Sequence, residues 1–214
     1  MTDTALPAAG TNPAAAWAEM AAGNDRFVRG VPAHPRQDVE RRTEVAHQQT
    51  PSAALFGCSD SRLAAEIIFD KGLGDLFVVR NAGQVVSASV IASLEYAVGV
   101  LGVPLIVVLG HDACGAVQAA IDAVEPDSAP LPAHIATHIA PIFEAVDRVP
   151  REDGGRDPLA VGREHLRDTV RDLVDGSELV SDAIAAGTLA IVGANYRLRE
   201  GRVVPDVIVG SVGS

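Results

Sequence analysis

The sequence has few of the residues that bind nucleic acid and no long uninterrupted apolar segment. Lys71 is the only lysine among 17 basic residues, and 28 acidic residues give a net charge of −11. Because phosphate binding needs clustered lysine and arginine, this balance argues against a nucleic-acid partner. The longest apolar run, residues 97–109, is interrupted by Gly102 and Pro104 and is too short to span a bilayer. We therefore expect no membrane partner either.

Cysteine is also scarce, and targeting signals are lacking. Residues 1–10 contain no basic segment followed by an apolar core, so we expect no secretory signal and a cytoplasmic location. The only two cysteines are Cys58 and Cys114. They could form one disulfide, but in a reducing cytosol paired thiols more often bind metals or act in catalysis. The sequence has no glycine-rich phosphate motif, so no nucleotide is predicted.

From residue 52 onward, short apolar runs alternate with helix-forming segments. Strands are predicted at 52–56, 76–79, 105–109, 189–192 and 203–209. Helices are predicted at 63–70, 89–100, 114–124, 133–146, 159–173 and 178–186. This alternation is typical of a parallel sheet covered by helices on both faces. The short connection before the last strand allows only an antiparallel return, which places that strand at an edge.

The remaining N-terminal part is predicted to be helical. Asn12 can cap a helix that begins at Pro13, a favoured first helical position. Residues 1–30 are therefore expected to form an N-terminal helical arm, and a polar helix is predicted at 38–49. No second domain is indicated, so we expect residues 1–214 to form one α/β domain: a four-stranded parallel core sheet plus an antiparallel fifth edge strand.

Both cysteines and one histidine follow strands of the predicted sheet. Cys58 comes after the first strand, and His111 and Cys114 come after the third. Sites in parallel α/β sheets form at the carboxyl ends of the strands, so these side chains should lie near one another. Thiolates and imidazoles suit zinc, and a catalytic zinc site has three such ligands with one open position. The sequence therefore predicts a catalytic zinc site, with Asp60 and Arg62 beside it.

Each of these residues also has a simpler interpretation. A buried cysteine is often only a small apolar side chain, and a histidine after a strand is often a turn residue. Asp60 could cap the helix predicted at 63–70, with Arg62 as its surface partner. The coincidence of two thiols and an imidazole at matching positions favours the metal site over these separate interpretations.

Two motifs and their flanking segments resemble a known family. The motifs are Cys58-Ser59-Asp60-Ser61-Arg62 and His111-Asp112-Ala113-Cys114-Gly115, and the resemblance continues through 77–83 and 94–98. Together they resemble the paired signature of β-class carbonic anhydrases over most of the chain. The resemblance implies a Zn²⁺ enzyme, a carbonate dehydratase, that hydrates CO2 to bicarbonate and a proton through zinc-bound hydroxide. It also implies a homodimer, sometimes doubled to a homotetramer.

The same resemblance assigns roles to further residues. Asp60 and Arg62 correspond to a pair next to the metal, and Asp60 is a fourth zinc ligand in a closed state. Gln49 corresponds to a glutamine that hydrogen-bonds bicarbonate. Phe77 and Tyr96 correspond to the aromatic wall of a substrate pocket that this family completes across the dimer interface.

Some β-class members also have a second, non-catalytic bicarbonate site made of a tryptophan, an arginine and a tyrosine. The corresponding positions here hold Leu55, Arg80 and Tyr196. Leucine has no N–H donor, so we expect no cooperative inhibition by bicarbonate.

Two other functions remain open from the sequence. A sister hydrolase on the same scaffold would act on carbonyl sulfide or carbon disulfide with the same ligands. A non-enzymatic domain with structural zinc is disfavoured, because such sites usually have four cysteine or histidine ligands.

The other histidines give weaker signals. His134 and His138 are four residues apart on one predicted helix, but they lack a third ligand for a second metal site. The remaining three, His34, His47 and His165, are expected at the surface, where any of them could shuttle protons.

Overall fold

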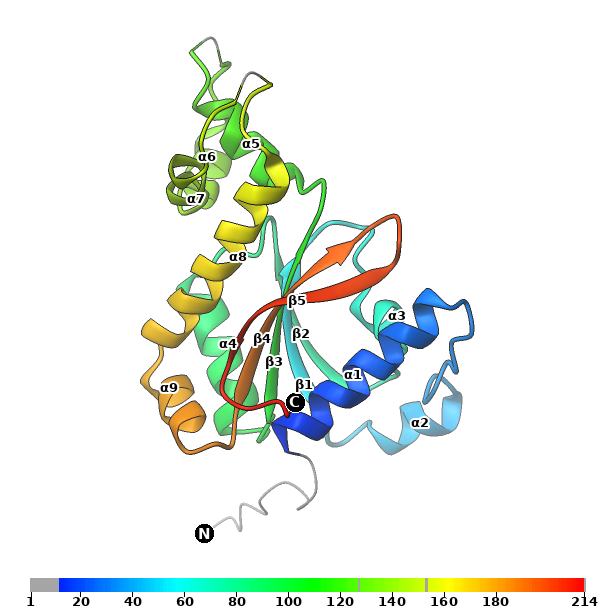
Figure 1. Ribbon diagram of the computed structural model, residues 1–214. Coiled ribbons are helices and arrows are strands. Elements are labelled where there is room, and N and C mark those ends of the chain that lie inside the picture. The colour runs from blue at the N-terminus through cyan, green and yellow to red at the C-terminus, as the bar shows by residue number, and fades with distance from the viewer. Residues whose placement is uncertain (1–11, 127, 153, 214) are drawn as a thin grey trace.

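A computed structural model describes residues 12–126, 128–152 and 154–213. The strands are β1 (Ala53–Cys58), β2 (Leu76–Asn81), β3 (Leu105–His111), β4 (Ala190–Arg197) and β5 (Arg202–Val209). The helices are α1 (Pro13–Val28), α2 (Val39–Glu44), α3 (Ala65–Ile68), α4 (Ala88–Gly99), α5 (Gly115–Ala123), α6 (Ala133–Ile139), α7 (Ile142–Arg148), α8 (Pro158–Asp175) and α9 (Glu178–Ala185). The sheet lies at the centre, and α5 to α7 rise beyond one end of it (Figure 1).

The strands form one sheet in the order β2-β1-β3-β4-β5. The first four are parallel, and β5 is antiparallel to β4 at the edge. The predicted α/β fold with a four-stranded parallel core and an antiparallel edge strand is confirmed. Pro205 lies within β5, which is compatible with an edge because proline has no N–H to donate to a neighbouring strand.

Alternate residues of the central strands enter two separate apolar cores. Every residue of β1 and β3 is buried. Leu55 and Val107 belong to the core that includes α1, α3, α5 and α7. Phe56 and Val108 belong to the core beneath α4, α8 and α9. Burial of each large side chain contributes roughly 1.5–3 kcal/mol, so the two cores hold helices against both faces as predicted.

The N-terminal helix packs on its own sheet. The Asn12 side chain accepts a hydrogen bond of 2.8 Å from the Ala15 N–H, so the predicted cap is present. Ala16 and Met20 are fully buried in the first core. Residues 1–11 of the predicted arm lie outside the described residues. The division of residues 1–214 into one domain with an arm at 1–30 stays a prediction.

Three predicted helices have different bounds in the structure. The helix predicted at 38–49 is limited to α2, with Asp38 as its N-cap, and none of its residues is buried. The helix predicted at 133–146 is divided at Pro141 into α6 and α7, because a proline cannot supply the N–H that a continuous helix requires. The helix predicted at 63–70 is reduced to α3, with Ala64 as its N-cap. Among the described residues, no helix has both the length and the apolar character needed to cross a membrane.

Candidate metal centre

The three predicted ligands converge at the carboxyl end of the sheet. Cys58 is the last residue of β1 and His111 is the last residue of β3, because the hydrogen-bonded ladders continue to these positions. Both residues were predicted to follow their strands, and this was wrong because each strand continues two residues further than predicted. Cys114 is the N-cap of α5, where helix N–H groups favour a negative side chain.

The geometry and the donor types both fit a zinc ion. The ligand atoms of Cys58, His111 and Cys114 all lie within 4.8 Å of one another, and all three residues are buried. The ligand atoms of a tetrahedral zinc site lie roughly 3.5–3.8 Å apart, so only a small adjustment is needed to bind the ion. Both cysteines are free thiols, so no disulfide competes with metal binding.

The His111 imidazole is oriented for coordination. Its Nδ1 lies 2.8 Å from the carbonyl oxygen of Asp112, which can only accept, so Nδ1 carries the proton. This leaves a lone pair on Nε2, which is buried and has no hydrogen-bond partner in the described structure. A buried polar atom without a partner is costly. A bound metal would supply that partner, and metal-ligating histidines are commonly fixed by such a bond at the other nitrogen.

The thiols differ in their surroundings. The Gly83 N–H donates a hydrogen bond of 3.2 Å to Cys58 Sγ. The neighbouring Cys114 thiol lowers the pKa of Cys58 to about 4 against the opposing effect of burial, and the Gly83 N–H acts in the same direction. The hydrogen bond to Cys58 and burial raise the pKa of Cys114. Zinc binds thiolates, so binding of the dication would displace the thiol protons.

Asp60 and Arg62 form a pair next to the ligands. Arg62 donates to Asp60 from Nε at 2.9 Å, from Nη2 at 2.6 Å and from its backbone N–H at 2.9 Å. These bonds hold the pKa of Asp60 well below its usual range. Arg62 Nη2 also donates to the Ala113 carbonyl at 3.2 Å, which ties the pair to the second motif. Asp60 does not cap a helix, because α3 begins later, at Ala65.

Arg80 supports the backbone of the first motif. Its Nε donates to the Cys58 carbonyl at 2.8 Å, and its Nη2 donates to the Asp60 carbonyl at 2.6 Å. These two bonds give Arg80 a structural role in the first motif.

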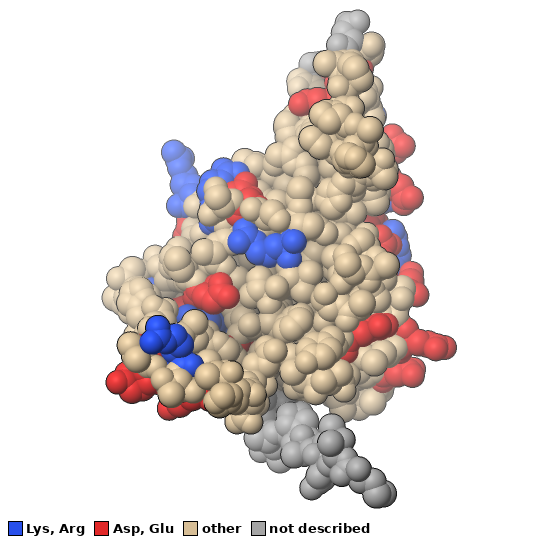
Figure 2. All heavy atoms as spheres, turned by 180° about the vertical axis from the view of Figure 1, so that it is seen from behind, with Lys and Arg blue, Asp and Glu red and all other residues tan. Residues whose placement is uncertain are grey.

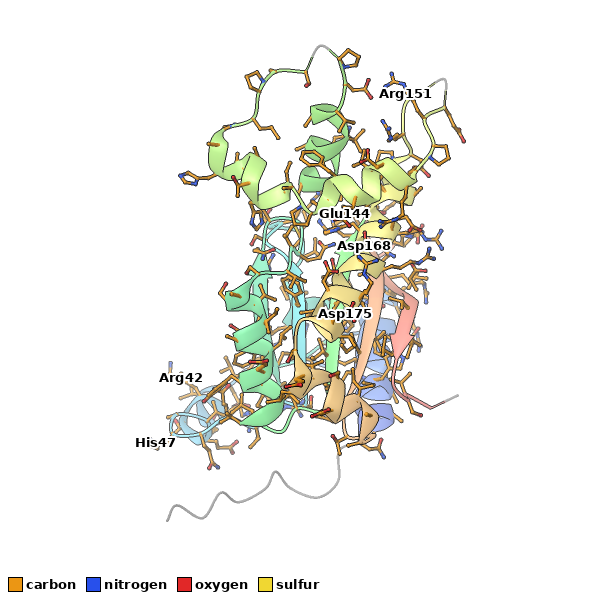
Figure 3. All side chains as sticks on the ribbon, turned by 90° about the vertical axis from the view of Figure 1, so that its left-hand side faces the viewer. Arg42, His47, Glu144, Arg151, Asp168 and Asp175 are labelled. Carbon is orange, nitrogen blue, oxygen red and sulfur yellow. The ribbon has the colours of Figure 1, made fainter. Side chains whose placement is uncertain are left out.

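The three predicted pocket residues lie at the other end of the sheet. Phe77 is the second residue of β2, and its ring centroid is 6.2 Å from that of Tyr96 on α4. Gln49 precedes β1, and with Tyr96 it lines a surface hollow. Because β1 rises about 3.3 Å per residue, its length alone places this end roughly 17 Å from Cys58. Figure 3 shows His47 at the lower end of the molecule and Glu144 and Asp168 toward the opposite end.

The structure also corrects the histidine predictions. His165 is 3% exposed and not at the surface, and its Nε2 donates to the Gly83 carbonyl at 2.7 Å. Its place four residues after Val161 and four before Thr169, on the buried face of α8, is the sequence signal that could have shown this. His34 and His47 are exposed as expected. The His138 Nε2 donates to the Ala82 carbonyl at 2.7 Å.

Comparisons with known proteins identify the family. The family model described as "Carbonic anhydrase" matches residues 53–203, which include all three ligands. The chain belongs to the β-class of the carbonic anhydrase family. The predicted resemblance and the predicted enzyme class are thus confirmed.

Relatives with this name cover nearly the whole chain. "Carbonic anhydrase 2" of Mycobacterium tuberculosis is 48% identical over 206 residues, covering 95% of this chain and 97% of the relative. "Carbonic anhydrase" of Mycolicibacterium smegmatis is 46% identical over 203 residues, covering 95% and 98%.

Solved structures share the fold. A β-carbonic anhydrase from Coccomyxa, in complex with acetazolamide, superposes with a TM-score of 0.69 at 26% identity, covering 91% of this chain and 84% of that one. A structure from a study of two tetrameric β-carbonic anhydrases from Sordaria macrospora gives a TM-score of 0.68 at 25% identity, covering 86% and 94%. Zinc is the metal of β-carbonic anhydrases, and the Cys–His–Cys cluster offers ligands that suit it, so the predicted cofactor is confirmed.

Proposed function

We propose that the chain catalyses the reversible hydration of CO2 to bicarbonate and a proton, with zinc held by Cys58, His111 and Cys114. The observation that carries this proposal is that a ring nitrogen of His111 lies within 4.8 Å of two free thiols, while its buried Nε2 has no hydrogen-bond partner among the described residues. Next to these ligands lies the Asp60 carboxylate, which is ion-paired with Arg62. A purely structural zinc site does not need such a carboxylate. Three ligands leave one coordination position open, which is the arrangement of a catalytic site.

The zinc ligands and the Asp60–Arg62 pair have different roles in the proposed reaction. A bound zinc ion lowers the pKa of a coordinated water toward about 7 and so supplies hydroxide near neutral pH. Cys58 and Cys114 each bring a negative charge that weakens this effect, so we expect activity to increase above pH 7. Asp60, kept ionised by Arg62, accepts a hydrogen bond from the attacking oxygen and orients it toward CO2. If Arg62 released it, Asp60 would be able to serve as a fourth ligand in a closed state.

The substrate pocket requires a second copy of the chain. Phe77 and Tyr96 supply the apolar wall against which CO2 lies, and Gln49 donates a hydrogen bond to bicarbonate. Since they lie at the far end of the sheet from the thiols of their own chain, we infer that they serve the site of the other subunit in a homodimer, which can pair further into a homotetramer. The two buried free thiols suit a reducing compartment, so we propose a cytoplasmic location.

Stopped-flow measurement of CO2 hydration tests this function. We expect turnover by the zinc-loaded protein, its loss after chelation, and its recovery when zinc is added back. Cys114→Ala should lose zinc and turnover together, because two protein ligands do not hold the ion tightly. Full turnover by a protein shown to be free of metal would contradict the proposal. Turnover of carbonyl sulfide or carbon disulfide without CO2 hydration would identify the sister hydrolase.

A further inference from the structure

A tight turn at residues 81–85 lies directly against the Cys58 thiol. Its Gly83 N–H is the donor 3.2 Å from Cys58 Sγ. The Asn81 side chain closes the turn by donating to the Val85 carbonyl at 2.8 Å and accepting from the Val85 N–H at 2.9 Å. The position of this turn therefore decides whether the sulfur keeps its backbone donor.

The backbone of the turn is strained. Gly83 has φ +78°, and a Cβ there would lie 2.7 Å from the Ala116 Cβ. Gln84 follows with φ +42°, although it is not glycine. A non-glycine residue in this region costs about 1–3 kcal/mol and persists only when its surroundings hold it there. The contacts that hold the turn thus matter for its geometry.

Two histidines from separate helices hold consecutive carbonyls of the turn. His138 on α6 donates from Nε2 to the Ala82 carbonyl at 2.7 Å, and His165 on α8 donates from Nε2 to the Gly83 carbonyl at 2.7 Å. A carbonyl only accepts, so both imidazoles carry a proton on Nε2. The Thr169 hydroxyl, one helical turn beyond His165, donates to the His165 carbonyl at 2.8 Å and lies 3.4 Å from the Gln84 carbonyl.

We propose that His138 and His165 are positioning residues for the metal centre, which hold the 81–85 turn so that the Gly83 N–H stays on Cys58 Sγ. The proposal rests on the zinc site described under the proposed function. An N–H bonded to a thiolate withdraws electron density from the sulfur and fixes its direction. Loss of either histidine bond lets the turn relax and weakens this control over the ligand. Residues that support metal ligands in this way commonly affect metal affinity.

Variants of the accessible histidine test this role. His138→Ala removes the donor, and His138→Gln restores one, because the Gln Nε2 reaches about as far from the backbone as the His Nε2. His134→Ala is the matched control, since His134 is exposed one turn earlier on α6 and makes no side-chain hydrogen bond among those found in the described part of the chain. His165→Gln provides a second, buried variant.

The readouts are the thiolate-to-cobalt charge-transfer band of the Co²⁺-substituted protein and the rate of zinc loss to a chelator. We expect His138→Ala to shift the band to lower energy and to release zinc roughly 10-fold faster. His138→Gln and His134→Ala should match the unmodified protein. Circular dichroism and a thermal melt establish that each variant is folded.

A folded His138→Ala protein with an unchanged band and zinc release rate would overturn the proposal, whatever happens to its turnover. If His165→Gln does not fold, the His138 pair still decides the matter. The metal readouts do not depend on CO2 hydration. A protein that binds zinc but does not hydrate CO2 would contradict the proposed function and leave this inference standing.

Discussion

The Asp60 carboxylate receives three hydrogen bonds from a single neighbour, Arg62. The Asp60 side chain is 17% exposed and that of Arg62 is 50% exposed, so solvent screens the pair and its main effect is orientation. The pair also makes the stability of the protein depend on pH, and the direction of this dependence follows from the direction in which the pKa of Asp60 is shifted. Because the folded-state pKa of Asp60 is lowered, its contribution to stability is present above the unfolded pKa of about 4 and is lost as the pH falls through the folded pKa.

Removal of this pair should change the pH dependence of turnover. In Arg62→Ala, Asp60 is no longer held away from the metal, so the carboxylate competes with hydroxide for the open zinc position. Hydroxide competes better as the pH increases, so we expect turnover to begin at a higher pH than in the unmodified protein. Arg62→Lys should lie between the two, because lysine keeps the charge but not the paired geometry. Stopped-flow rates from pH 6 to 9 test this. An unchanged pH profile for Arg62→Ala would contradict the switch.

Leu55 leads to a prediction about regulation. It is 2% exposed within the first core, next to Val78 and Val107 in the sheet. The leucine side chain has no N–H that could donate to an anion, and the Arg80 side chain already donates to the Cys58 and Asp60 carbonyls. We therefore expect bicarbonate to inhibit CO2 hydration along a hyperbolic curve, measured over a concentration series. Sigmoidal inhibition, or bicarbonate bound by Arg80 and Tyr196 in a crystal, would contradict this prediction. Either result would show that the second bicarbonate site works with leucine at the tryptophan position.

At the scale of elements, the sequence indicates which strands and helices exist better than where they end. The four parallel strands were predicted from their short continuous apolar runs, and the antiparallel β5 was predicted from the short connection that precedes it. Cys58 and His111 were predicted to follow their strands, yet the neighbouring strands continue to pair with them. The three ligands could be predicted because strand ends meet at one edge of a parallel sheet. The Gly83 N–H on Cys58 could not, because a backbone donor has no side chain to mark it.

The segment between α1 and β1 has its own anchor. Asp75 is 7% exposed and accepts from Arg36 Nε at 2.7 Å, from Arg36 Nη2 at 2.7 Å and from the Gly72 N–H at 2.8 Å. These bonds raise the pKa of Arg36, with the hydrogen bond to Asp75 as the largest cause. Because the chain continues from this anchor through α2 to Gln49, the anchor also helps to position a proposed substrate-binding residue.

Neutralising the anchor should destabilise the protein. In Asp75→Asn the carboxylate that receives Arg36 is lost, and we expect the free energy of unfolding to fall by about 1–3 kcal/mol. Asp38→Asn is the matched control, because asparagine caps α2 as well as aspartate does. Urea unfolding of both variants measures the difference. Equal stability of the two would show that Asp75 contributes no more than a surface carboxylate.

Charged side chains of the described residues are absent from a broad area on one face of the molecule. Figure 2 shows a face with a wide region without charged side chains, bordered mainly by acidic groups on the right and by both basic and acidic groups on the left. Glu95 is the only charged residue of α4, and its carboxylate accepts a hydrogen bond of 2.7 Å from Ser177. The exposed face of α4 is thus uncharged and includes Tyr96, which is 46% exposed. Such a surface suits contact with a second copy of the chain.

A mixed dimer provides the sharpest test of a shared pocket. Cys114→Ala chains lack a metal site but keep Gln49, whereas Gln49→Ala chains keep the metal ligands. If each metal centre uses Gln49 of the partner subunit, neither variant alone is fully active, but a mixed dimer contains one complete site. In the purified mixed dimer one of the two sites is complete, so we expect about half of the sites to be active, because the two sites of a twofold dimer are equivalent. Co-expression of the two chains with different tags, followed by stopped-flow assay of the doubly purified dimer, measures this recovery. The control mixes Cys114→Ala with His111→Ala, which share the same defect and should stay inactive. No gain in the first mixture over the Gln49→Ala protein alone would place Gln49 outside the partner's site.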